Sequence, residues 1–228
     1  MDIYAVRSNW KINSHYFDSL IKFLPTVEQN KINKYLKWED AQKSLIGKIL
    51  IRSIVINKYG FKNKGIHFSI NEFGKPYLKD IKEFNFNISH SGEWVVCAVD
   101  TRPIGIDIEE INDFDFNIAN NFFSTEEYSD LMNQDKMNRL EYFFDLWTLK
   151  ESYIKMIGTG LSKGLDFFTM KKTSDNIWTN GSDKTYYFKQ YNTIDGYKTS
   201  VCAMNKNFPT DINTIKLKQF IKNSMNSL

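Results

Sequence analysis

The sequence predicts an α+β fold of two α/β subdomains related by a pseudo-twofold axis. Each subdomain would pack one long helix on a small, mainly antiparallel sheet. Each half of the chain carries one strong amphipathic helix, at residues 40–59 and 140–157, and short strand-like runs follow it. The apolar run at 96–99 also matches the run at 201–204. We therefore expect an internal duplication with a ligand site in the cleft between the halves, the alternative being a repeated element order that arose by chance.

The first half is expected to hold an opening strand, a short helix, the long helix ended by Gly60, and three short strands separated by turns. These elements cover residues 1–7, 25–36, 40–59, 66–70, 84–88 and 94–99. The join between the halves is expected near residues 101–103. It divides the chain into an N-terminal subdomain, 1–102, and a C-terminal subdomain, 103–228.

The second half is expected to repeat this order. Ser124 and Glu127 have the spacing of a capping box at the start of a helix, and Gly158 would end the long helix. The remaining strands and helices are expected at residues 104–109, 140–157, 167–171, 186–191 and 197–204. The tail, 216–228, is either a weak amphipathic helix or a frayed end.

Composition narrows the class of protein. The net charge of +3 on 228 residues is too small an excess to indicate a nucleic-acid-binding surface. The chain shows no apolar run long enough to cross a membrane and no signal-peptide pattern, so we expect a cytoplasmic protein. Cys97 and Cys202 lie in apolar runs and are expected to be buried thiols, since no zinc-type spacing surrounds them.

The strand at 104–109 carries two carboxylates on one face. Side chains alternate along a strand, so Asp107 and Glu109 point to the side opposite the isoleucines between them. A hard cation such as Mg²⁺ stabilises such a pair and shares its other positions with water and phosphate. The alternative is a solvated acidic edge strand, which the neighbouring Glu110 favours.

The helix at 140–157 places Trp147, Glu151 and Lys155 along one stripe. A carboxylate bordering an apolar stripe is usually paired or metal-bound. The alternative is an ordinary surface ion pair between Glu151 and Lys155.

Two turns supply groups suited to an anion. Residues 86–92 close a strand with Ser89, His90 and Ser91, and could present hydroxyls, backbone N–H groups and a titratable imidazole. The loop at 73–76 adds Lys75 beside a glycine, and Lys31 adds a further positive charge. The alternative for the first turn is a plain hairpin with an exposed histidine. Together with the carboxylates, these groups suit a magnesium-bridged pyrophosphate.

These motifs, in this order, closely resemble the 4′-phosphopantetheinyl transferase family. They are Phe-Gly-Lys-Pro at 73–76, Asn-Ile-Ser-His-Ser at 87–91, Gly-Ile-Asp-Ile-Glu at 105–109, and Trp-Thr-Leu-Lys-Glu-Ser-Tyr-Ile-Lys at 147–155. The resemblance covers residues 1 to about 209. It is to the monomeric, surfactin-synthetase-activating type rather than the short trimeric type.

The resemblance implies an Mg-dependent enzyme that moves the 4′-phosphopantetheine arm of coenzyme A to a serine of an apo carrier protein. Its implied metal ligands are Asp107, Glu109 and Glu151, for Mg²⁺ or Mn²⁺. Its implied catalytic residues are Glu151 as general base, directly or through water, Lys155 as a neutraliser of pyrophosphate charge, and His90 as a phosphate ligand. The remaining coenzyme A contacts it implies are Lys31, Ser44, Phe73, Gly74, Lys75, Pro76 and Ser89.

The same resemblance implies peptidyl, acyl or aryl carrier domains as partners, with no nucleic acid and no membrane. An apolar group is expected either to dock the carrier or to form core: Phe122, Phe123, Tyr128, Leu131 and Met132. Residues 158–189 are a second expected contact. Glu28 departs from relatives that carry a basic residue there. A magnesium phosphodiesterase and a non-enzymatic binding module are the alternative functions.

Overall fold

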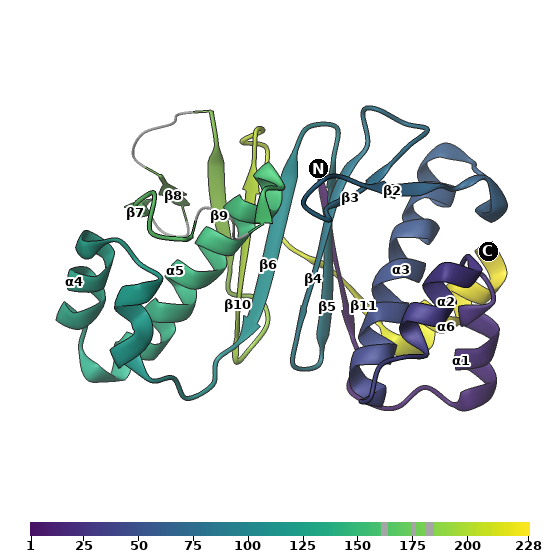
Figure 1. Ribbon diagram of the computed structural model, residues 1–228, viewed down its shortest axis with the longest axis horizontal. Helices are drawn as coiled ribbons and strands as arrows, with labels where there is room; N and C mark the ends of the chain where they lie inside the picture. The colour runs from purple at the N-terminus through teal and green to yellow at the C-terminus, as the bar shows by residue number, and fades with distance from the viewer. Residues whose placement is uncertain (161–163, 175–176, 181–184) are drawn as a thin grey trace.

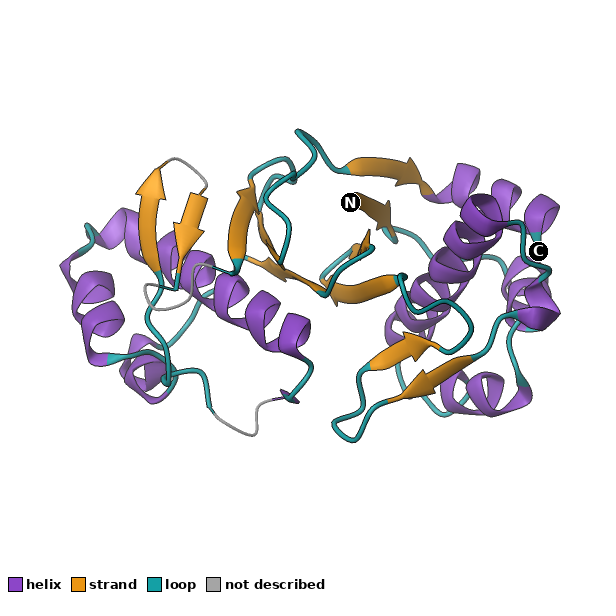
Figure 2. Cartoon of the chain, turned by 90° about the horizontal axis from the view of Figure 1, so that it is seen from above, coloured by secondary structure: helices purple, strands orange, loops and turns teal. Residues whose placement is uncertain are grey.

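The computed structural model describes residues 1–160, 164–174, 177–180 and 185–228. Its strands form a four-stranded sheet in the order β11-β1-β5-β4, a five-stranded sheet in the order β6-β10-β9-β8-β7, and a separate β2–β3 hairpin. The two larger sheets lie side by side in the middle of the molecule, with helices toward both ends (Figures 1 and 2). The predicted α+β class is confirmed.

The strands are β1 (Asp2–Arg7), β2 (Phe68–Ile70), β3 (Pro76–Leu78), β4 (Asn85–Ser91), β5 (Trp94–Asp100), β6 (Ile104–Glu110), β7 (Lys171–Ser174), β8 (Ile177–Thr179), β9 (Tyr187–Tyr191), β10 (Tyr197–Ala203) and β11 (Asn213–Lys216). The helices are α1 (Ser14–Ile21), α2 (Thr26–Ile32), α3 (Trp38–Tyr59), α4 (Thr125–Asn133), α5 (Lys136–Ile157) and α6 (Leu217–Ser227), with short 3₁₀ turns at Asn63–Gly65 and Phe116–Asn121.

The two halves share one topology. β1 pairs antiparallel with β5, which pairs antiparallel with β4, and the long helix α3 lies between β1 and β4 in sequence. β6 pairs in the same way with β10, which pairs with β9, and α5 takes the place of α3. In each half, a strand, a long helix and two further strands follow one another in sequence, and the last strand lies between the other two in the sheet. This repeated order agrees with the expected duplication.

Three apolar clusters hold the fold together. One fills the space between the first sheet and its helices, and a second fills the space around α5. The third combines residues of both sheets, including Ile3 and Val96 from the first and Ile106 and Val201 from the second. Because this shared core removes apolar surface of both halves from water, it holds the halves together as one body.

The local stop and start signals of the sequence are confirmed. Gly60 and Gly158 end the two long helices in the left-handed conformation, with φ of 69° and 72°. Ser124 and Glu127 form a complete capping box. Cys97 and Cys202 are buried free thiols.

Two expectations need correction. Residues 213–228 were assigned to the second half, but β11 pairs with β1 and α6 packs on α1 and α3 (Figure 1). The expected strand at 167–171 is absent from that stretch of the described chain, where β7 begins only at Lys171. The buried ammonium of Lys150 donates hydrogen bonds to the carbonyls of Leu165 and Phe168 in this region.

None of the helices in the described part of the chain is both long enough and apolar enough to cross a membrane.

Candidate active site

The candidate active site is built on β6 and α5, which touch backbone to backbone at Gly105. A Cβ atom there would come within 2.0 Å of the Ser152 carbonyl oxygen and 2.5 Å of the Met156 nitrogen. Only glycine fits this approach. The isoleucines of β6 point into the shared core, so Asp107 and Glu109, which alternate with them, face α5, as the sequence predicted.

Asp107 is the most buried of these carboxylates, with 1% of its surface exposed. Its Oδ1 accepts hydrogen bonds from Ser89 Oγ of β4, at 2.8 Å, and from Lys155 Nζ of α5, at 2.5 Å. Lys155 Nζ also donates to Ser89 Oγ, at 2.9 Å. Ser89, Asp107 and Lys155 therefore form one triangle that joins both halves of the molecule.

Glu109, like Asp107, accepts a hydrogen bond from a serine of β4. Ser91 Oγ, two residues beyond Ser89 on β4, donates to Glu109 Oε2 at 2.7 Å. Asn87, two residues before Ser89, accepts the Ile106 backbone N–H through its side-chain oxygen at 3.0 Å. Asn87, Ser89 and Ser91, which alternate along β4, thus all bond to β6.

Glu151 lies half-buried on α5, one turn before Lys155. Burial and the charge of Asp107 raise the pKa of Glu151. Burial likewise raises the pKa of Asp107 and of Glu109, and the charge of Asp107 adds to the shift of Glu109. Raised pKa values on neighbouring carboxylates mean that their charges lack full compensation, which is typical of functional sites.

The three carboxylates suit a hard divalent cation. Asp107 Oδ2 is buried and has no hydrogen-bond partner among the described residues, an arrangement that a cation would relieve. Among those residues, no three carboxylate, imidazole or thiol groups form a ready-made metal cluster. Mg²⁺ is usually bound by one or two carboxylates plus substrate phosphates and water, so an incomplete protein shell is what such a site requires.

A cavity of about 260 Å³ opens beside Glu151 and Lys155. Its other wall is the loop between β2 and β3, so the structure brings the predicted residues Phe73, Gly74, Lys75 and Pro76 to the carboxylate site. Gly74 has a φ of 85°, a conformation that favours glycine. Asn71 shapes the loop by accepting the N–H groups of Phe73 and Lys75.

Lys75 lines this cavity and also bonds to the protein, and its role as a coenzyme A contact stays a prediction. Its ammonium donates to the carbonyls of Met156, at 2.9 Å, and Ile104, at 3.3 Å. Burial lowers the pKa of Lys75 to about 8. The side chain thus fastens the loop to the end of α5 and the start of β6, and its amine is already engaged.

His90 lies on the face of β4 opposite Ser89 and Ser91, the face turned toward α3. Desolvation and the nearby cation of Lys43 lower the pKa of His90. Lys31 is exposed in the last turn of α2, and Ser44 is half-buried on α3. Neither bonds to the carboxylates in the part of the chain that the structure describes, so their predicted roles rest on the resemblance alone.

Glu28 is engaged elsewhere. Its carboxylate pairs with Lys48 at 3.1 Å and with Arg52 at 3.8 Å, both on α3. The acid that departs from the family pattern is therefore balanced by two cations.

The apolar residues expected either to dock the carrier or to form core differ in their burial. Phe123 and Leu131 are buried in the core of the second half, whereas Met132 is exposed. Phe122 and Tyr128 are partly buried against that core. Of the other expected contact, 158–189, residues 161–163, 175–176 and 181–184 lie outside the described residues.

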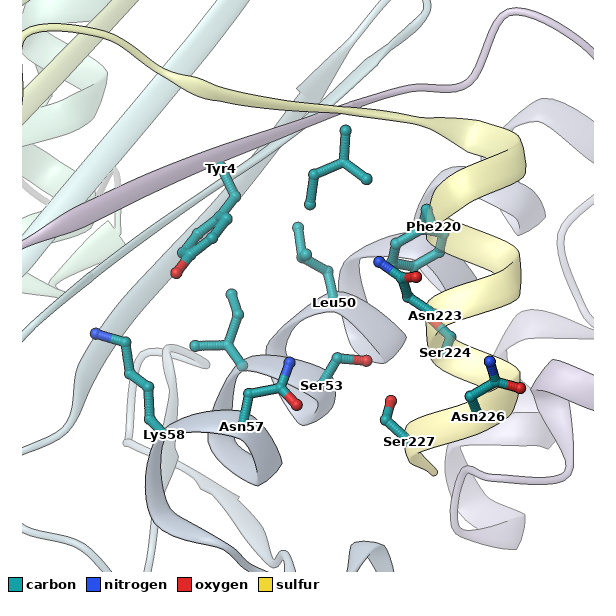
Figure 3. A pocket seen from close by; sticks show the side chains of 12 residues that line it. Tyr4, Leu50, Ser53, Asn57, Lys58, Phe220, Asn223, Ser224, Asn226 and Ser227 are labelled. Carbon is teal, nitrogen blue, oxygen red and sulfur yellow. The ribbon is translucent and has the colours of Figure 1, made fainter.

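A second cavity, of about 340 Å³, lies between α3 and α6 in the first half (Figure 3). Its polar lining consists of hydroxyls, amides and Lys58, such as Tyr4, Ser53, Asn57 and Asn223. The Lys58 ammonium is paired with Asp2. The lining contains no carboxylate to hold a cation, so this cavity is not the candidate active site.

The sequence indicated Ser91 as one of the groups suited to an anion but not as a partner of Glu109, and it did not point to Asn71 or Lys43. The alternation of Asn87, Ser89 and Ser91 on one face of β4 was a usable signal for Ser91. Lys43 is brought near His90 by the packing of α3 on β4, a long-range contact that no local pattern reveals.

Comparisons with known proteins agree with this geometry. Residues 8–102 match the family described as 4′-phosphopantetheinyl transferase, N-terminal, and residues 103–203 match the 4′-phosphopantetheinyl transferase superfamily. The chain is 38% identical over 224 residues to 4′-phosphopantetheinyl transferase Sfp of Bacillus subtilis (strain 168), covering 97% of this chain and 100% of that protein. It is 37% identical to 4′-phosphopantetheinyl transferase gsp of Aneurinibacillus migulanus, covering 85% and 82%, and 42% identical to psf-1 of Bacillus pumilus, covering 72% of each.

Proposed function

The chain belongs to the 4′-phosphopantetheinyl transferase family, and from this we propose that it transfers the 4′-phosphopantetheine arm of coenzyme A to a serine of an apo carrier protein. The observation that supports the proposal is the grouping of Asp107 and Glu109 with Lys155 and Glu151, the last two of which line a cavity together with the loop at 73–76. Carriers of peptide, polyketide or fatty-acid synthesis are the proposed partners.

The proposed reaction is a phosphoryl transfer in which this chain positions both substrates. The serine oxygen attacks the β-phosphorus of coenzyme A, and the bond from that phosphorus to the oxygen shared with the α-phosphate breaks. The products are a phosphodiester-linked arm and adenosine 3′,5′-bisphosphate. Positioning and electrostatic stabilisation account for most of the catalysis in reactions of this kind.

Glu151 is the proposed acceptor of the serine proton, directly or through a water. Its raised pKa makes it a better base than an ordinary glutamate, because an efficient base has a pKa closer to the working pH. Lys155 would stabilise the negative charge that grows on the α-phosphate of the leaving adenosine 3′,5′-bisphosphate. His90, with Lys43 beside it, would bind a further phosphate, and that anion would favour the protonated imidazole.

Asp107, Glu109 and Glu151 are the proposed ligands of Mg²⁺, or of Mn²⁺, which accepts the same oxygen donors. When bound, the ion would offset charge on the diphosphate oxygens as a Lewis acid.

The test is intact-mass spectrometry of an apo peptidyl carrier protein incubated with this protein, coenzyme A and Mg²⁺. We expect a gain of one phosphopantetheine on the carrier serine, absent with a chelator and strongly reduced in Glu151→Gln. Failure to modify peptidyl, polyketide and fatty-acid carriers alike would refute the proposal. Cleavage of coenzyme A without any carrier would point instead to a hydrolase.

A further inference from the structure

Ser91 stands at the end of β4, beside the carboxylate pair of β6. We propose that Ser91 is a positioning residue that holds the Glu109 carboxylate in the orientation needed to bind the divalent cation. The inference rests on the proposed function, because it assigns Glu109 to the metal site.

The hydroxyl of Ser91 makes two bonds that fix its direction. It accepts the backbone N–H of Glu110 at 3.1 Å and donates its one proton to Glu109 Oε2 at 2.7 Å. A hydroxyl has a single hydrogen to donate. Since the Glu110 amide occupies the acceptor side, that hydrogen is aimed at Glu109.

Hydrogen bonds hold the turn after Ser91 in position, which restricts movement of the Ser91 hydroxyl. Tyr197 of β10 accepts the backbone N–H of Glu93 at 3.1 Å and donates to Glu110 Oε1 at 3.0 Å. Gly92, with a φ of 50°, lies so close that a Cβ there would come within 2.2 Å of the Tyr197 hydroxyl. The hairpin between β4 and β5 is therefore clamped onto both β6 and β10.

Glu109 depends on this one contact. Among the described residues, Ser91 supplies the hydrogen bond that reaches its carboxylate, whereas Asp107 has both Ser89 and Lys155. The negative charge of Asp107 and the positive charge of Lys155 both act on Glu109, but neither fixes the direction of its carboxylate as a hydrogen bond does. Partners that orient a metal ligand typically contribute 10- to 100-fold in metal affinity.

The experiment compares Ser91→Ala with Tyr197→Phe. Each variant removes one hydroxyl from the same interface between the halves, but only the first loses a bond to Glu109. Mn²⁺ is titrated into the full chain with coenzyme A present, and bound ion is measured by electron paramagnetic resonance. The half-saturating Mg²⁺ concentration for carrier modification is measured in parallel.

We expect Ser91→Ala to weaken Mn²⁺ binding by about tenfold and to raise the half-saturating Mg²⁺ concentration similarly, with kcat recovering at high Mg²⁺. Ser91→Thr, which keeps the hydroxyl, should restore binding. Tyr197→Phe loosens the turn but keeps the bond from Ser91 to Glu109, so it should weaken Mn²⁺ binding much less than Ser91→Ala does. Equal Mn²⁺ affinity in Ser91→Ala and wild type would overturn the positioning role and leave the transferase intact. A wild type that modifies the carrier without binding Mn²⁺ or Mg²⁺ would overturn the metal centre and this role together.

Discussion

The two long helices occupy equivalent places in the duplicated fold but fill the space against their sheets differently. Each has 22 residues and ends at a left-handed glycine. α3 buries a largely aliphatic face, which includes Leu45, Ile49 and Leu50. α5 buries Thr148, Lys150 and Ser152 completely. α3 also buries two polar side chains, Gln42 and Arg52, so the two helices differ in what their buried polar groups contact.

The polar groups of the two helices also have different partners. On α3, buried Gln42 bonds to residues 8–12 and buried Arg52 bonds to residues 63–66, so both hold loops against the helix. On α5, Thr148 bonds to Ser200 of β10, within the layer that also contains Asp107. In the second half, polar side chains therefore lie between the helix and the sheet, where apolar side chains would stabilise the fold more.

The sharpest test of this division is Asp107→Asn, which should abolish most activity while leaving the fold intact. Losing one charged ligand at the transfer site removes several kcal/mol of transition-state stabilisation, or about a thousandfold in kcat/KM. Burial already disfavours the ionised carboxylate, so the amide should not destabilise the chain. Carrier-modification kinetics and denaturant unfolding of the same preparation measure both effects. If Asp107→Asn lost both its activity and its fold, Asp107 would be needed for stability, and the proposed difference between the halves would be wrong.

The second test concerns the ion pair of Lys150 and Glu127, whose side chains are 0% and 1% exposed and 2.8 Å apart. Lys150→Met should lower the free energy of unfolding by about 3–5 kcal/mol, because it leaves a buried carboxylate uncompensated. The double variant Lys150→Met with Glu127→Leu should recover part of that loss. Urea unfolding of the wild type and of both variants measures these changes in the free energy of unfolding. A single variant as stable as the wild type would contradict the expected cost of leaving a buried carboxylate without its cation.

The matched test in the first half is Leu45→Ala on α3. Leu45 is fully buried in the first apolar cluster, so truncation should cost about 2–5 kcal/mol of stability through lost burial and a cavity. Activity per folded molecule should be unchanged, since Leu45 packs in the first apolar cluster and not among the carboxylates of the candidate active site. A fall in kcat under conditions where the variant is fully folded would show that α3 also contributes to the chemistry.

The features of the site that are local in sequence could be predicted. Strand alternation placed Asp107 and Glu109 on one face, and helical spacing placed Glu151 one turn before Lys155. The role of Lys75 could not be predicted, because its two carbonyl partners belong to β6 and α5, distant in sequence. The return of β11 to β1 also escaped prediction, since an exposed four-residue strand paired in parallel leaves no strong local pattern.

The smallest expected effect is a pH dependence of stability that distinguishes Asp107 from ordinary surface carboxylates. Its pKa is raised in the folded protein, and an unfolded aspartate titrates near about 3.9. Below that pH both states are protonated and the residue contributes nothing. As the pH rises above it, the unfolded chain ionises first, so the folded state loses stability relative to Asp107→Asn.

The difference in unfolding free energy between Asp107→Asn and the wild type, measured in a chelator, should therefore grow from pH 4 upward in favour of the variant. It should level off once the folded carboxylate has ionised. Mg²⁺ with coenzyme A should reverse the sign, because ligands that bind only the folded wild type stabilise it. A difference that shrinks with rising pH would mean that the Lys155 ammonium outweighs burial, and that the second half compensates its polar groups as fully as the first.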